Sequence, residues 1–199
     1  MAVKVSRKAE QSQATQAALL AAARTLFAER GYAAVATEEI VRAARVTRGA
    51  LYHHFAGKED LLRALCHELN RELAEKCAAA ALAEEEQWAQ IVAGVDAFLD
   101  ACTDPAVQQI LMLDAPGVLG WEEWRAIDAQ YGLGIVRASL EAAMESGLVE
   151  RQPVEPLTHL LVGAMDEAAM YIARAADPVT ARREMGEALR RTVEGLRAS

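Results

Sequence analysis

One segment of this 199-residue chain constrains its fold more than any other: TEEIVRAARVTRGALYHHFAGKEDLL, residues 37–62. It predicts two short helices, because a threonine opens each of them and apolar residues follow at helical spacing. Only Arg45 and Val46 remain for the turn, and Thr47 caps the second helix. Lys58 begins the next helix. The pattern is typical of a helix-turn-helix, which places its second helix in a DNA groove and fixes the helix ends to phosphates.

The remainder of the chain also predicts helices. Alanine is abundant, there are only 5 prolines, and we find neither a strand pattern nor an internal repeat. Residues 114–120 are expected to form a loop, and Gly132 and Gly134 indicate a bend unless they are merely tolerated within a helix. We expect an all-α protein of about nine helices, near residues 12–30, 38–44, 47–54, 58–83, 88–102, 104–113, 122–146, 156–175 and 178–196.

Charge is distributed unevenly along the chain. The net charge is −8, which taken alone argues against a nucleic-acid partner. However, residues 1–58 carry nine Lys/Arg against four Asp/Glu, whereas residues 59–199 carry twelve against twenty-five. Unless this asymmetry is chance, only the basic part meets a polyanion. Lys4, Arg7 and Lys8 either form an arm along the DNA backbone or are a solvated tail.

Several classes of protein are disfavoured. Cys66, Cys77 and Cys102 have no CxxC spacing, which fits reduced packing thiols in a cytoplasmic protein better than a redox sensor. No apolar stretch is long enough to span a membrane, and the N-terminus has no apolar signal region. GxSxG, P-loop, GxGxxG and HExxH motifs are missing, and the adjacent His53 and His54 point apart on a helix. We therefore expect no enzyme, no metal and no cofactor.

Residues 15–66 resemble the DNA-binding domain of the tetracycline-repressor (TetR) family of bacterial transcriptional regulators. The resemblance rests on four segments that occur in the family's order across about fifty residues. Arg45 departs from the pattern, because the family has a glycine there that relaxes the backbone of the turn; an arginine adds a potential phosphate contact. The matching segments are Phe27-Ala-Glu-Arg-Gly-Tyr32, Thr37-Glu-Glu-Ile40, Ala44-Arg-Val-Thr-Arg-Gly-Ala-Leu-Tyr-His-His-Phe55 and Lys58-Glu-Asp-Leu61.

Position on these helices suggests how DNA is contacted. Thr37 and Thr47 lie at helix N-termini, where free N–H groups and a hydroxyl can hold phosphates. Arg48 is the best base reader, because a guanidinium can pair with O6 and N7 of guanine together. The resemblance implies that Lys58 binds a phosphate. His54 matches a histidine of the family pattern, and the alternative for His54 is that it packs in the core or caps the helix. The predicted DNA contacts are Thr37, Arg45, Thr47, Arg48, Gly49, Tyr52, His53, His54 and Lys58, with Leu51 and Phe55 in the core.

For residues 59–199 the resemblance concerns architecture only. It implies that a helix-turn-helix DNA-binding domain at residues 1–58 precedes a helical domain that dimerises and holds a small inducer. Two-fold symmetry supports a dimer independently, because one short helix reads too few base pairs alone. Unless these side chains face their own core, the interface is a four-helix bundle formed by Leu161, Ala164, Ala168, Ile172, Met185, Leu189 and Val193.

The ligand site is predicted from large apolar side chains, for which plain core packing is the alternative. Its predicted lining is Phe98, Met112, Trp121, Trp124, Tyr131 and Met165, with Asp166 or His159 as a polar contact. The excess of acidic residues in residues 59–199 favours a neutral or cationic ligand over an anionic one. We expect a cytoplasmic homodimeric repressor that a small-molecule effector releases from a palindromic double-stranded DNA operator. The alternative is a helix-turn-helix regulator that has no ligand.

Overall fold

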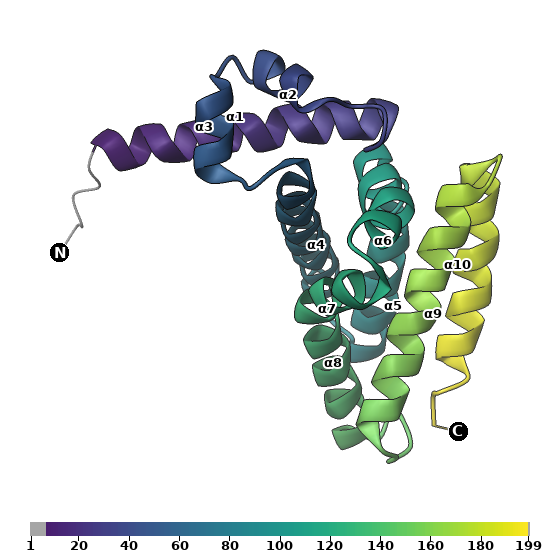
Figure 1. Cartoon of the computed structure of the whole chain (residues 1–199). Coiled ribbons are helices and arrows are strands. Elements are labelled where there is room, and N and C mark those ends of the chain that lie inside the picture. Colours follow the sequence, from purple (N-terminus) through teal and green to yellow (C-terminus); the bar gives the residue numbers. More distant parts are fainter. Residues whose placement is uncertain (1–6, 199) are drawn as a thin grey trace.

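Helices make up most of residues 7–198, the part of the chain that this computed structural model describes (Figure 1). The predicted all-α class is confirmed, although these residues form ten α-helices and a π-helical segment where about nine helices were expected. The predicted basic arm cannot be followed in the structure, because Lys4 and the side chains of Arg7 and Lys8 lie outside the described part of the chain. The helices are α1 (Arg7–Arg30), α2 (Thr37–Ala43), α3 (Arg48–His54), α4 (Lys58–Leu82), α5 (Gln87–Ala101), η1 (Val107–Asp114), α6 (Ala115–Val118), α7 (Trp121–Tyr131), α8 (Leu133–Glu145), α9 (Val154–Arg174) and α10 (Pro178–Glu194).

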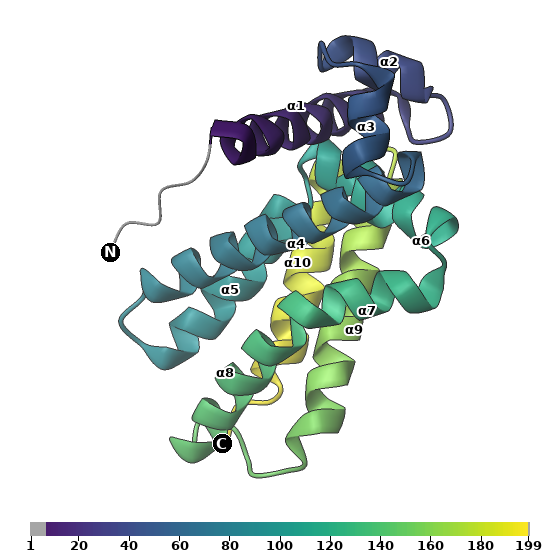
Figure 2. The ribbon, with the colours of Figure 1, turned by 60° about the vertical axis from the view of Figure 1, so that its left-hand side comes forward.

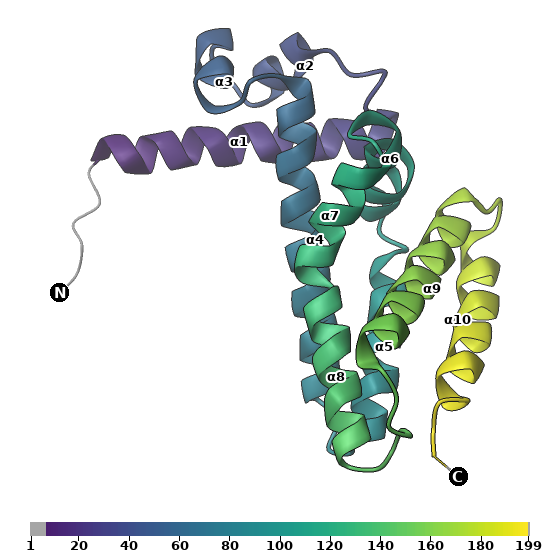
Figure 3. The same cartoon turned by 60° about the horizontal axis from the view of Figure 1, so that its bottom comes forward.

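The first three helices form a head across one end of the molecule. Helix α4 starts in this head and runs into a body built from the other helices, beside α5 and α7 (Figure 3). Figure 2 shows α8 at the end of the body furthest from the head, and α9 and α10 as an adjacent pair. One contiguous core joins head and body, from Phe27 on α1 through Leu65 on α4 to Ile172 on α9. None of the described helices has both the length and the apolar character that a membrane span requires.

The predicted loop at residues 114–120 is wrong. A helix begins after Asp104, whose carboxylate accepts the N–H of Ala106 at 2.8 Å, and continues through η1 and α6 as far as Val118. Pro116 lies within this continuous helix, just after the π-helical segment passes into α6. Gly120, with a φ of 84°, supplies the actual chain reversal.

The predicted single helix at residues 122–146 is also wrong, because it is divided at Gly132 into α7 and α8. Glycine is the least favourable residue in a helix interior apart from proline, so the break occurs where helix propensity is lowest. Gly147, with a φ of 77°, ends α8 as the sequence predicts. Helix α7 packs against α4 near the head, and α8 extends further from the head (Figure 3).

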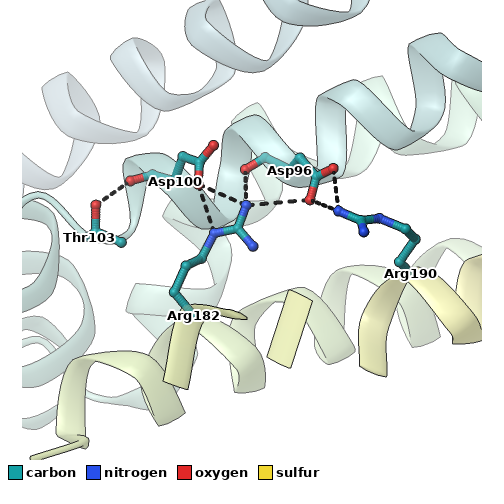
Figure 4. A network of polar contacts seen from close by, with 5 residues as sticks. All are labelled: Asp96, Asp100, Thr103, Arg182 and Arg190. Carbon is teal, nitrogen blue, oxygen red and sulfur yellow. Dashed lines mark hydrogen bonds and ion pairs between the residues drawn. The ribbon is translucent and has the colours of Figure 1, made fainter. Parts of the chain in front are cut away.

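An ion-pair network fixes α10 to α5 (Figure 4). Arg182 donates to the carboxylate of Asp100 at 2.8 Å and to the backbone oxygen of Asp96 at 3.1 Å. Arg190 donates to both carboxylate oxygens of Asp96, at 2.9 and 3.0 Å. Asp96 is therefore the acceptor that the two arginines share, and its side chain is only 29% exposed.

We expect the Asp96→Ala variant to lose about 1 kcal/mol of stability, since it leaves Arg190 unpaired and removes one acceptor from Arg182. The melting temperature should fall by roughly 2–4 °C, and by less at high salt, where the pair is screened. Glu187→Ala is the matched control, because its partner Arg191 lies one turn away on the same exposed face of α10. Equal melting temperatures for the two variants would show that the network contributes nothing.

Candidate nucleic-acid interface and ligand cavity

Helix α2 begins one residue earlier than its sequence predicts. Ala36, rather than Thr37, occupies the N-cap position, with an extended backbone (φ −86°, ψ 149°). The carboxylate of Glu39 accepts the N–H of Ala36 at 2.9 Å and pairs with Arg30 at 2.7 Å. That guanidinium holds the pKa of Glu39 below its usual value. Thr37 thus lies within the first turn, still at the helix N-terminus but not as its cap.

The turn of the helix-turn-helix has the geometry that a glycine would favour. Arg45 has a φ of 55°, the one positive value among the non-glycine residues of the described chain. The chain then closes through a hydrogen bond from the N–H of Val46 to the oxygen of Val41 at 3.2 Å. Thr47 caps α3 as predicted, because its hydroxyl accepts the N–H of Ala50 at 3.2 Å. The left-handed conformation costs an arginine about 1 kcal/mol.

We expect Arg45→Gly to raise stability by about 0.5–1 kcal/mol, because the glycine relieves the backbone strain. The matched control is Arg42→Gly, which removes the same exposed side chain from the regular backbone of α2 and should cost about 1 kcal/mol. Urea denaturation of both variants measures the difference. Destabilisation of similar size by both substitutions would show that the turn is not strained.

Helix α3 presents a polar outer face. Arg48, Gly49, Tyr52 and His53 are exposed along it, whereas Leu51 is fully buried beneath, as predicted. The guanidinium of Arg48 lies 5.6 Å from the centre of the Tyr52 ring and 3.5 Å from the carboxylate of Glu38. His54 is half-buried and packs edge-on against His53, with ring centres 5.2 Å apart. The guanidinium of Arg48, the phenol of Tyr52 and the imidazole of His53 are thus all exposed on one helix.

Lys58 has a role that its sequence position does not reveal. Its ammonium donates to the backbone oxygens of Tyr32 at 2.8 Å and of Val35 at 2.9 Å. It also lies 4.0 Å from the centre of the Tyr32 ring, and burial lowers the pKa of this lysine. Lys58 therefore holds the loop between α1 and α2 closed. A lysine has three N–H donors, so one remains for a phosphate.

Two further contacts join the head to the body. The carboxylate of Asp114, at the end of η1, accepts the N–H of Tyr32 at 2.7 Å. The guanidinium of Arg24 forms a two-pronged pair with Glu72 on α4, at 2.7 and 2.9 Å. The loop that Lys58 holds is thus bonded to α4 on one side and to η1 on the other.

A cavity of about 140 Å³ lies inside the body, between α4, α5, α7, α8, α9 and α10. Most of its wall is apolar. Of the predicted lining residues, Phe98, Tyr131 and Met165 are present, and Asp166 is the predicted polar contact that reaches it. Sequence analysis missed Asn70 and Asp128, which are polar positions inside amphipathic helices with no local signal of a cavity.

The other predicted ligand contacts do not reach this cavity. Met112 is buried in the core around η1. Trp124 is buried with its indole N–H donated to the oxygen of Leu111 at 2.9 Å, and Trp121 is 57% exposed beside it. His159 is exposed on α9. Both tryptophans lie in the first turn of α7, whereas Asp128 and Tyr131, which line the cavity, lie toward the other end of this helix.

One end of the cavity carries two acidic side chains. Asp166, 5% exposed, pairs with Arg125, whose guanidinium also lies 3.4 Å from Asp128. Burial and the neighbouring Asp128 raise the pKa of Asp166 to about 7, although Arg125 opposes both effects. Burial also raises the pKa of Asp128. The Tyr131 hydroxyl meets the Nδ1 of His67 at 3.0 Å. Within residues 7–198 no group of three or more His, Cys, Asp or Glu side chains could hold a metal ion.

Both the N-terminal and the C-terminal part of the chain match models of known protein families. Residues 19–65 match the family of bacterial regulatory proteins called tetR, and residues 88–196 match the tetracyclin repressor-like C-terminal domain. The second match alone covers more than half of the chain. This chain belongs to the TetR family. It is therefore a transcriptional regulator with a helix-turn-helix DNA-binding domain.

Individual relatives agree with this. The TetC protein of transposon Tn10 from Escherichia coli is 28% identical over 162 residues, which cover 81% of this chain and 82% of TetC. The regulator TtgR of Pseudomonas putida is 39% identical over 82 residues, covering 41% of this chain and 39% of TtgR. The crystal structure of a TetR-family regulator from Pectobacterium atrosepticum has a TM-score of 0.85 at 29% identity, with 98% of each chain covered. RolR in complex with resorcinol, at 19% identity and a TM-score of 0.70 over 92% of this chain and 89% of RolR, shares the fold.

The side chains predicted for the dimer interface of this TetR-family protein pack against their own chain. Ala168, Ile172, Leu189 and Val193 are buried within their own chain. Leu161 lines the cavity, and Ala164 and Met185 are half-buried against the core. These side chains therefore face inward, which was the alternative explanation of their spacing. The exposed apolar side chains of α9 are Leu160 at 71% and Tyr171 at 53%.

Proposed function

We propose that this TetR-family regulator is a homodimeric repressor that leaves a palindromic operator when a small molecule occupies its cavity. The observation that carries the proposal is the course of α4. Lys58 at its start holds the α1–α2 loop, and Asn70, Leu73 and Cys77 further along the same helix line the cavity. An occupant that displaces α4 would thus displace the head. The cavity itself favours a regulator with a ligand over one without.

We propose that residues 1–58 form the DNA-binding domain and that residues 59–199 form the regulatory and dimerisation domain. Helix α4 begins at the boundary and connects the two. The proposed DNA contacts remain Thr37, Arg45, Thr47, Arg48, Gly49, Tyr52, His53, His54 and Lys58. In a dimer the two copies of α3 would meet the two halves of a palindrome. Release follows if the occupied cavity favours a spacing of the two heads that does not match DNA, which requires unequal ligand affinity for the two states.

We propose that the dimer forms through the exposed stripe of α9. Leu160, Gly163, Glu167 and Tyr171 follow one another at helical spacing on one side of the helix, and a side chain at Gly163 would meet open space. A second copy related by a two-fold axis would cover this stripe and form a four-helix bundle together with α10.

Sedimentation and operator binding together test this proposal. The double variant Leu160→Glu/Tyr171→Glu should sediment as a monomer at micromolar concentration and lose specific binding to an operator duplex, because two heads no longer act together. Leu82→Glu is the matched control, since Leu82 on α4 is 82% exposed and lies away from the stripe. A wild-type monomer, or a dimeric double variant, would contradict the proposed interface.

A further inference from the structure

We propose that the cavity selects ligands that join a small apolar body to a protonated amine, with the amine beside Asp128 and Asp166. This inference rests on the proposed effector function of the same cavity, and it adds the chemical class of the effector. Three observations carry it: the apolar wall, the absence of a basic side chain from the lining, and the unequal number of charges at the acidic end.

The wall dictates the body of the ligand. Phe98, Ile91, Leu161 and Met165 belong to a lining that is apolar except at a few positions. A cavity of about 150 Å³ holds one benzene ring, so the observed volume of about 140 Å³ limits the apolar body of the ligand to about one ring. A polar group in contact with this wall would lose its hydration without a replacement partner.

The charges dictate the polar end of the ligand. Asp128 and Asp166 line the cavity, whereas no lysine, arginine or histidine does among the described residues. Arg125 pairs with both carboxylates but is not part of the lining, so it reaches them from outside the cavity. An anionic ligand would therefore meet two carboxylates and no cation, whereas an ammonium group would find acceptors already in place.

Asp128 and Asp166 share a single guanidinium, that of Arg125, so one positive charge stands against two carboxylates. The groups that face Asp166 are Arg125 and Asp128 on α7 and the Cys102 thiol that follows α5. Burial raises the pKa of that thiol, so it stays neutral, and Arg182 of α10, which lies near it, is paired with Asp96 and Asp100. A bound ammonium group supplies the missing charge and favours the ionised form of Asp166, so binding should release a proton near neutral pH.

Three compounds of matched size test the charge preference: 2-phenylethylamine, 2-phenylethanol and phenylacetate. Isothermal titration calorimetry of the full chain near neutral pH should show the amine binding at least about ten-fold more tightly than the alcohol, with the anion weakest. Asp166→Asn should reduce the advantage of the amine to within about three-fold. Glu122→Gln, an exposed acid on α7 away from the cavity, is the matched control and should leave that advantage unchanged.

A second readout does not depend on a variant that folds. In buffers of different ionisation enthalpy, wild-type protein should release a proton on binding the amine and none on binding the alcohol. Equal affinity for amine and alcohol, tighter binding of phenylacetate, or binding of none of the three would overturn the proposal. Operator affinity measured on the same samples separates the two claims: selective binding of the amine without weaker operator binding would contradict the effector role alone.

Discussion

Arg48→Ala is expected to weaken operator binding by at least about ten-fold and to relax the base preference at one position in each half-site, because a bidentate arginine–guanine contact is worth about 1–3 kcal/mol. Arg48 is 67% exposed and lies over the Tyr52 ring, so its removal leaves the core intact. The melting temperature should therefore stay unchanged. Fluorescence anisotropy with a labelled operator and its single-base variants measures both effects.

The control for Arg48→Ala is Arg71→Ala, which removes the same charge from an exposed position on α4. It should change neither operator affinity nor base preference. If the two variants bound the operator equally well, α3 would not be the element that reads DNA.

Lys58→Met is expected to lower both stability and operator binding. The substitution keeps most of the apolar stem but leaves the backbone oxygens of Tyr32 and Val35 without their donor. An unpaired buried acceptor costs about 1–3 kcal/mol, and solvent reaches this half-buried site, so we expect a total of about 2 kcal/mol. Thermal denaturation should show a fall of roughly 4–8 °C. Operator binding weakens because the loop that orients α2 is no longer held.

This result separates two roles of Lys58. A lysine that only binds phosphate would leave the melting temperature unchanged and reduce the dependence of binding on salt by about one unit per half-site. Lys76→Met, an exposed lysine on the same helix, is the control for loss of charge. An unchanged melting temperature together with a reduced salt dependence would show that the loop contact is dispensable.

The sequence predicts the head well because its signals are local. The cap at Thr47, the turn at Arg45 and the burial of Leu51 each depend on residues within a few positions. The partners of Lys58 were not predictable, because they are backbone oxygens more than twenty residues earlier in the chain. The cap of α2 was predicted at Thr37, whereas Glu39 accepts the N–H of Ala36, so the prediction differs by one residue although the contact is local.

The body shows the limit of periodicity. A stripe such as Ala168, Ile172, Leu189 and Val193 has the same spacing whether it faces its own core or a second copy, and only the packed structure shows that it faces inward. The cavity was half predictable, since Phe98, Tyr131 and Met165 line it but Trp121 and Trp124 do not. Two glycines marked the bend, but sequence could not say that Gly132 would divide the helix.

The most direct test of the whole account is selection of random duplex DNA by the purified protein at physiological salt. We expect enrichment of a palindrome, with two inverted half-sites read by two copies of α3. Enrichment of a site without inverted symmetry, or of no sequence at all, would contradict it.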